Sequence, residues 1–130
     1  MDLDSVIYLL IGSTFGLILR LFIKYKSKKN SRFYLNHSLI VNVLSSLLLG
    51  IFIGLNSTNK NLFLLVSVGF LGCFSTFSTF IYELFNLIQK GKYISFIIYY
   101  IEVLVLSFLF FCFGSFTILI FKNWTKNFLY

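Results

Sequence analysis

The chain contains four long apolar runs that are separated by three short polar links. A helix needs roughly 20 apolar residues to cross the hydrocarbon core of a membrane, and each run approaches or exceeds that length. The runs do not alternate every second residue, which favours helices over the strands of a barrel. They extend over residues 6–23, 35–55, 62–88 and 94–121. The pattern predicts an all-α membrane protein with four transmembrane helices, in one domain that spans residues 1–130.

The composition agrees with a membrane location. Charged residues make up 12% of the chain, whereas a soluble domain has about 25%. The net charge of +7 arises from basic residues between the apolar runs, so we interpret it as a signal for orientation and expect no nucleic-acid partner. The first and third links hold seven Lys or Arg, against three on the opposite side. Because cytoplasmic loops carry the basic excess, both termini are expected outside the cell.

Cysteine and histidine show no metal-binding spacing. Cys73 and Cys112 lie inside apolar runs, and we expect both to be buried free thiols. His37 is the only histidine and begins the second run. We expect it at the membrane interface and assign it no chemistry.

The third run contains the segment GFLGCFSTFSTF at residues 69–80. Two glycines and a cluster of hydroxyl residues are unusual in lipid, and they predict a helix that is broken near the middle of the membrane. Non-helical backbone is tolerated there only where it is buried in protein or lines a cavity. The alternative is that the small residues simply allow neighbouring helices to approach closely.

The end of this segment favours an anion path. Phe77 and Phe80 share one helix face and are interleaved with Ser78 and Thr79. A phenyl ring has a positive edge, and hydroxyl groups donate hydrogen bonds, so both suit a small anion. Asn42 in the second run either bonds a neighbouring helix or replaces part of an ion's hydration shell, and the sequence leaves both interpretations open.

Three ionisable residues lie inside the runs, where such residues usually face an interior or a watery cavity. Arg20 either extends to the membrane interface or raises the anion concentration at a pore mouth. Glu83 follows Phe80 by three residues, and we expect it to be neutral or paired. The sequence identifies no partner for Glu102.

Three of these segments together resemble the small fluoride channels of the Fluc or CrcB family. Residues 12–20, GSTFGLILR, resemble the pattern Gly-Gly-x-x-Gly-Ala-x-x-Arg, and residues 38–42, SLIVN, are similar to Thr-Leu-x-Val-Asn. Residues 69–80 followed by Glu83 resemble Gly-Phe-x-Gly-Gly-x-Thr-Thr-Phe-Ser-Thr-Phe-x-x-Glu. The resemblance covers nearly the whole chain.

The resemblance implies an antiparallel dimer of four-helix subunits with two fluoride pores. The third helix of each subunit is broken, and the carbonyl oxygens of Gly72 and Ser75 from both subunits would surround one structural sodium ion that is not transported. Oxygen ligands suit such a hard cation. Arg20 and Glu83 would lie at the pore mouth or support it. The implied fluoride pathway consists of Asn42, Phe77, Ser78, Thr79, Phe80, Tyr99 and Ser107.

The chain departs from the family pattern at several positions. Cys73 and Ser75 stand where Gly and Thr are usual, and Ser45 replaces a common Gly. Ser75 still offers a backbone carbonyl to sodium. The biased distribution of basic residues favours one direction of insertion, so we hypothesise an oppositely oriented paralogue as partner, with a second copy of this chain as the alternative.

The resemblance therefore implies a passive, fluoride-selective channel that exports fluoride from the cytoplasm, and not an enzyme. No nucleotide-binding loop is present that would couple transport to ATP. Two other classes are alternatives, and the first of them has a similar size and four spans. A small multidrug antiporter relies on a carboxylate in the middle of its first span, where this chain has no acid. A non-conducting scaffold would need neither Asn42 nor the Phe77/Phe80 pair.

Overall fold

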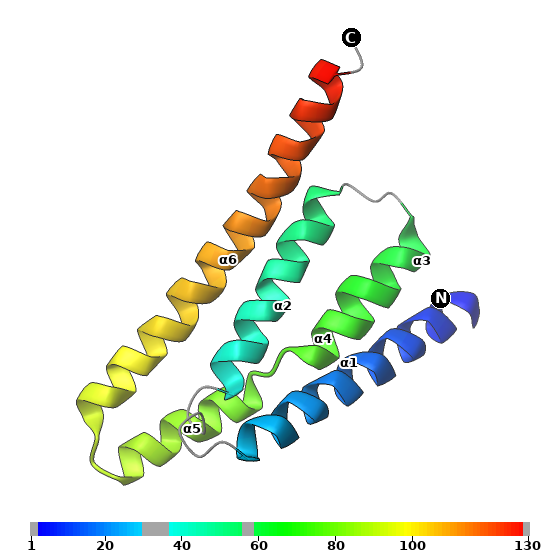
Figure 1. Cartoon of the computed structure of the whole chain (residues 1–130). Helices are drawn as coiled ribbons and strands as arrows, with labels where there is room; N and C mark the ends of the chain where they lie inside the picture. Colours follow the sequence, from blue (N-terminus) through cyan, green and yellow to red (C-terminus); the bar gives the residue numbers. More distant parts are fainter. Residues whose placement is uncertain (1–2, 30–36, 56–58, 129–130) are drawn as a thin grey trace.

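The computed structural model describes residues 3–29, 37–55 and 59–128, and these residues form an all-helical protein (Figure 1). The prediction of an all-α protein is therefore confirmed. Residues 64–71 form π-helical turns, which we label η2. The elements in chain order are α1 (Leu3–Lys29), α2 (His37–Gly54), α3 (Lys60–Phe63), η2 (Leu64–Leu71), α4 (Gly72–Phe74), α5 (Ser78–Gln89) and α6 (Tyr93–Phe128).

Three stretches of the described chain are long and apolar enough to cross a membrane, namely Leu3–Lys26, Lys60–Gln89 and Tyr93–Thr125. The second predicted run gives a shorter helix, α2, whose apolar part is Ser38–Gly54. Its 18 residues extend about 27 Å at 1.5 Å per residue. Residues 30–36 and 56–58 of the predicted runs and links lie outside the described residues.

The helices run alternately toward two ends of the molecule. The end of α2, the start of α3 and the end of α6 lie toward the upper end in Figure 1, and the end of α1 and the α5–α6 turn lie toward the lower end. The segment from α3 to α4 descends beside α1, while α2 and α6 lie side by side. The described part of the first predicted link, at the end of α1, thus lies at the same end as the third link.

Glycines bring the backbones within each helix pair close together. A Cβ atom added to Gly12 or Gly16 of α1 would lie 2.0 or 2.2 Å from a backbone oxygen of η2. The same atom on Gly50 of α2 would lie 2.2 Å from a backbone oxygen of α6, and on Gly114 of α6 it would lie 2.5 Å from one of α2. Such contacts are typical of membrane helices, which gain little from hydrophobic association and pack through small residues instead.

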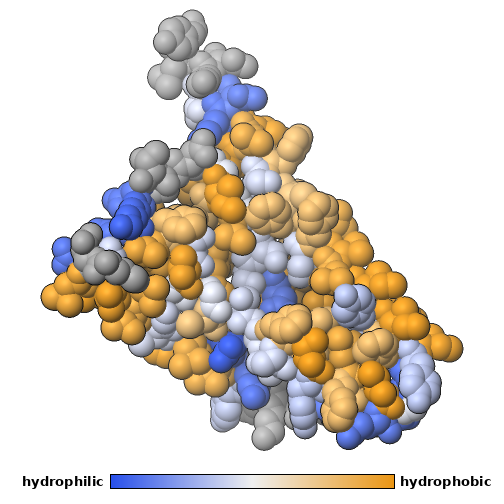
Figure 2. Space-filling model, turned by 180° about the vertical axis from the view of Figure 1, so that it is seen from behind, coloured by the Kyte–Doolittle hydropathy of each residue, from blue (hydrophilic) through white to orange (hydrophobic). Residues whose placement is uncertain are grey.

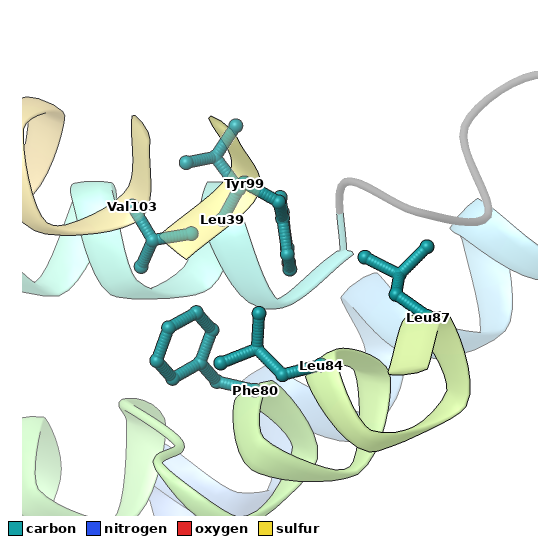
Figure 3. Close-up of a cluster of buried hydrophobic side chains, with 6 residues drawn as sticks. All are labelled: Leu39, Phe80, Leu84, Leu87, Tyr99 and Val103. Atoms are coloured by element: carbon teal, nitrogen blue, oxygen red, sulfur yellow. The ribbon is translucent and has the colours of Figure 1, made fainter. Parts of the chain in front are cut away.

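The buried hydrophobic cluster joins α2, α5 and α6 (Figure 3). Its members are Leu39, Phe80, Leu84, Leu87, Tyr99 and Val103. Most large apolar side chains of α1 and α6 are instead exposed on the molecular surface. That distribution is expected when lipid rather than water covers the helices.

The two cysteines are free, as predicted, but they are not both buried. Cys112 is exposed on α6 and Cys73 of α4 is only half-buried, because α6 turns much of its surface outward. The prediction of a buried Cys112 was therefore wrong. His37 is the first residue of α2.

Candidate functional site: a broken helix and the groove beside it

The helix that begins at α3 is interrupted between α4 and α5. Ser75 has extended backbone dihedral angles, with φ −66° and ψ 157°, and α5 begins three residues later at Ser78. The sequence predicted a break in this segment, and the structure has one at residues 75–77.

The side chain of Asn42 holds the interrupted backbone in place. Its Nδ2 donates to the carbonyl oxygen of Thr76 at 3.0 Å, and the N–H of Thr76 donates to its Oδ1 at 2.9 Å. An amide side chain has one acceptor and a two-hydrogen donor, so it replaces the backbone partners that Thr76 would have in a continuous helix. The proposed interhelical bond of Asn42 is therefore present in the protein.

This pairing leaves two carbonyl groups without their helical donors. In a continuous α-helix, the N–H of Thr76 would donate to Gly72 and that of Thr79 to Ser75. Thr76 donates to Asn42 instead, and the N–H of Thr79 lies 3.4 Å from the Thr76 hydroxyl oxygen. Within the described residues, the carbonyl oxygens of Gly72 and Ser75 accept no hydrogen bond. The hydroxyl groups of Thr76 and Thr79 also bond each other.

The two phenylalanines of the break differ strongly in exposure. Phe77 is 74% exposed, whereas Phe80 is only 3% exposed. Their ring centroids lie 6.2 Å apart, and the Phe80 ring also lies 5.8 Å from that of Tyr99 and 6.2 Å from that of Tyr100. Phe80 thus packs against α6, while Phe77 projects from the surface of the chain.

Glu83 is paired, which is one of the two predicted states. The Tyr99 hydroxyl donates to Glu83 Oε2 at 2.6 Å. Tyr99 is 6% exposed and belongs to the buried cluster of Figure 3. The Tyr99 hydroxyl therefore has its hydrogen-bond partner on α5.

A groove of about 390 Å³ lies beside the break, between α2, the interrupted helix and α6. One face of the molecule shows polar and weakly polar residues in a band between two apolar flanks (Figure 2), and the groove lining has the same mixed character. The groove is lined by Asn42, Ser45, Ser46, Leu49, Ser67, Leu71, Gly72, Ser75, Thr76, Phe77, Phe80, Val103, Leu104 and Ser107.

Most of the predicted site residues converge on this groove. They are Asn42, Gly72, Ser75, Phe77, Phe80 and Ser107. Ser78 is exposed at the start of α5, and Thr79 is half-buried, so neither lines the groove. Arg20 is half-buried on α1, and Glu102 is exposed on α6. Among the described residues, neither of these two charged side chains forms a hydrogen bond or an ion pair.

Several polar residues of the groove were not among the site residues predicted from the sequence. Ser45 and Ser46 follow Asn42 by three and four positions, so they share its helix face. That spacing was visible in the sequence and would have identified both. Thr76 was recognisable only as part of the hydroxyl cluster, and Ser67 was not distinguishable because it lies in the apolar stretch before the first glycine.

These features define a small helical membrane protein whose interrupted helix borders a groove with a mixed polar and apolar lining. The family described as "CrcB-like protein, Camphor Resistance (CrcB)" matches residues 7–115, and the chain belongs to that family. It is 67% identical over 123 residues to "Fluoride-specific ion channel FluC 2" of Prochlorococcus marinus subsp. pastoris, covering 95% of this chain and 100% of the relative.

Two relatives come from a single further strain. The "Fluoride-specific ion channel FluC 2" of Prochlorococcus marinus strain MIT 9312 is 48% identical over 122 residues, covering 94% of this chain and all of the relative. The "Fluoride-specific ion channel FluC 1" of that strain is 31% identical over 114 residues, covering 88% of this chain and 93% of the relative. The chain is thus similar to both of these proteins from strain MIT 9312.

Proposed function

We propose that this chain is a subunit of a fluoride-selective channel in the cell membrane, through which fluoride leaves the cytoplasm passively. Membership of the CrcB family and similarity to the named fluoride channels over nearly the full chain support this function. The observation that carries it is the groove at the helix break, which is lined by an amide, hydroxyl groups and phenyl rings but by no acidic side chain among the described residues.

The path begins at the groove beside Asn42. One hydrogen of its amide bonds Thr76, and the second remains available to an ion in the groove. Phe77, Phe80 and Ser107 continue the lining. Each group replaces part of the hydration shell as fluoride moves down its electrochemical gradient, and a narrow path with strong donors favours the smallest halide.

Ser78, Thr79 and Tyr99 have a different part in this mechanism. The Thr79 hydroxyl bonds that of Thr76, and the Tyr99 hydroxyl bonds Glu83. Both hydroxyls therefore position the walls of the path. Ser78 is exposed beside Phe77, where a partner subunit would bring it into the pathway.

A structural sodium ion belongs to the proposal, held by the carbonyl oxygens of Gly72 and Ser75 from two subunits. The residues fit this ion, because both carbonyls lack a hydrogen-bond donor within the described chain. A Cβ added to Gly72 would meet nothing within 4 Å, so the surface beside this carbonyl is open to a second subunit. The bound ion would supply a positive charge that stabilises the break and favours anions nearby.

The second subunit is antiparallel to the first, and we favour an oppositely oriented paralogue over another copy of this chain. The bias of basic residues toward the first and third links supports a single direction of insertion, with both termini outside. The two MIT 9312 relatives support the existence of paralogue pairs in such organisms. The strong exposure of Phe77 also favours a covering subunit.

Fluoride efflux from loaded liposomes, recorded with a fluoride electrode, tests the function. The chain is reconstituted alone and together with a co-expressed paralogue, and chloride efflux is measured in parallel. Efflux of fluoride but not chloride is expected. Absence of fluoride efflux in both preparations would refute the channel function, whereas efflux by the purified chain alone would refute the requirement for a paralogue.

Two substitutions test the pathway residues. Phe80→Ile removes the ring from the groove, and Asn42→Asp removes the amide donor, so each should abolish efflux. Tyr100→Phe is a matched control, because Tyr100 stacks on Phe80 and keeps its ring in the variant. Unchanged efflux in both pathway variants would refute the assigned lining.

A further inference from the structure

Ten Ser and Thr hydroxyl groups in the described part of the chain form two contrasting sets. Members of the first set donate to a backbone carbonyl three or four residues earlier in their own helix. They are Ser13, Thr14, Ser45, Ser115, Thr117 and Thr125. These hydroxyls are satisfied within one helix and require nothing from a neighbour or a ligand.

Members of the second set line the groove and have no hydrogen-bond partner in the described part of the chain. They are Ser46, Ser67, Ser75 and Ser107. The Ser107 hydroxyl is in addition completely buried. Four hydroxyls without partners thus line one cavity, whereas five of the six hydroxyls of the first set lie outside its lining. Ser5, Ser38, Ser78 and Ser95 also lack a hydroxyl partner in the described part of the chain, but they do not line the cavity.

Two of these hydroxyls form an extension of the groove beyond Asn42. Ser46 lies one helical turn after Asn42 on the same face of α2, about 6 Å further along the axis. Ser67 reaches the groove from η2, four residues before Leu71 and eight before Ser75. The end of α2 and the start of α3 lie toward the same end of the molecule (Figure 1). Ser46 follows Asn42 along α2, and Ser67 precedes the break in η2, so both lie toward that end, which we call the α2–α3 side.

An unpaired hydroxyl in an apolar setting is unfavourable unless a ligand or water completes its hydrogen bond. The groove has the volume and the polar partners to hold such a guest. No acidic side chain among the described lining residues would repel an anion. Asn42 and Ser46 are about 6 Å apart along the axis of α2. This spacing allows an ion to contact the Ser46 hydroxyl before it leaves the Asn42 amide.

We propose that Ser46 and Ser67 form a second station of hydroxyl donors for fluoride, on the α2–α3 side of Asn42. This inference rests on the proposed channel function and adds two residues to it. The ion passes between the Asn42 amide and these hydroxyls, so that the pathway continues along α2 beyond the phenylalanines.

The test compares fluoride conduction in two double variants of the reconstituted channel. Ser46→Ala with Ser67→Ala removes the station, and Ser13→Ala with Ser115→Ala removes two hydroxyls that bond only their own helices. The fluoride concentration that gives half-maximal flux should rise about tenfold in the first variant, equivalent to about 1.4 kcal/mol. It should not change in the second.

A rescue variant separates ion binding from packing. Ser46→Thr with Ser67→Thr keeps both hydroxyls and should retain the wild-type half-maximal concentration. An unchanged value in the alanine variant would overturn the inference while the wild-type flux left the channel function intact. Loss of the assembled dimer in the alanine variant, measured by light scattering, would also overturn it, because the serines would then serve subunit contact. A wild-type protein without fluoride flux would refute both proposals.

Discussion

Replacing Asn42 with leucine should release the backbone at the helix break. Leucine has a similar size but can neither accept from the N–H of Thr76 nor donate to its carbonyl oxygen. The substitution therefore removes both bonds, of 2.9 and 3.0 Å, between α2 and the break. The broken helix would lose its polar connection to α2 while the neighbouring apolar packing is kept.

The size of the effect follows from these two bonds. Hydrogen bonds between membrane helices contribute about 0.6 kcal/mol on average and up to about 1.7 kcal/mol. Thr76 is only 5% exposed, so water cannot readily replace its lost partner, and an unsatisfied N–H costs about 1–3 kcal/mol. We therefore expect the native break to be destabilised by about 2–4 kcal/mol, which corresponds to roughly 30-fold to 1,000-fold in population.

Hydrogen–deuterium exchange at the Thr76 amide measures this change directly. Exchange requires the N–H to open, so the rate in Asn42→Leu should rise by roughly 30-fold to 1,000-fold. Ser45→Ala is the control, because the Ser45 hydroxyl bonds the carbonyl of Asn42 and does not touch Thr76. Wild-type protection of Thr76 in Asn42→Leu would refute the conclusion that the amide holds the break.

Three other predictions concern packing, the paired carboxylate and the cation. Gly16→Ala places a Cβ atom 2.2 Å from the Phe70 carbonyl oxygen, so α1 must move away by about 1 Å. We expect the variant to be less stable by about 1–3 kcal/mol and to melt at a lower temperature. An unchanged melting curve would contradict the close contact. Tyr99→Phe removes the hydrogen bond to Glu83 and should lower the free energy of unfolding by about 1–3 kcal/mol. Tyr100→Phe loses no hydrogen bond of the described chain and should melt like the wild type. Equal melting temperatures of the two variants would argue against the bond between Tyr99 and Glu83. Replacing sodium by an organic cation should lower the melting temperature of the assembled channel, because a ligand that binds only the native state stabilises it. Identical melting temperatures in both salts would exclude a stabilising sodium site.

The helices and the break were predictable because they depend on local sequence. Long apolar runs without alternation specify membrane helices, and the glycine and hydroxyl cluster of residues 69–80 marked the position of the interruption. The π-helical turns of η2 were not predictable, since the same apolar residues also fit an ordinary α-helix. These turns pack against α1, where Gly12 and Gly16 lie close to the carbonyl oxygens of Leu65 and Phe70.

The candidate site was predictable in its residue types and less so in their roles. Asn42, Phe77, Phe80 and Ser107 were selected from the sequence and do line one groove. The bonds that commit Asn42 to Thr76 and Tyr99 to Glu83 join different helices. Such pairings depend on how the helices rotate and cross, which a linear pattern does not encode.

The glycine contacts have a consequence for how this protein tolerates sequence change. Gly50 and Gly114 set the separation of α2 and α6, whose facing surfaces also form two walls of the groove. An added methyl group at either position would act as a spacer and widen the groove without touching its lining. If the proposed pathway runs through this groove, its width would be controlled from positions that the ion does not contact, and selectivity for the smallest halide would be lost through a substitution at the helix contact alone.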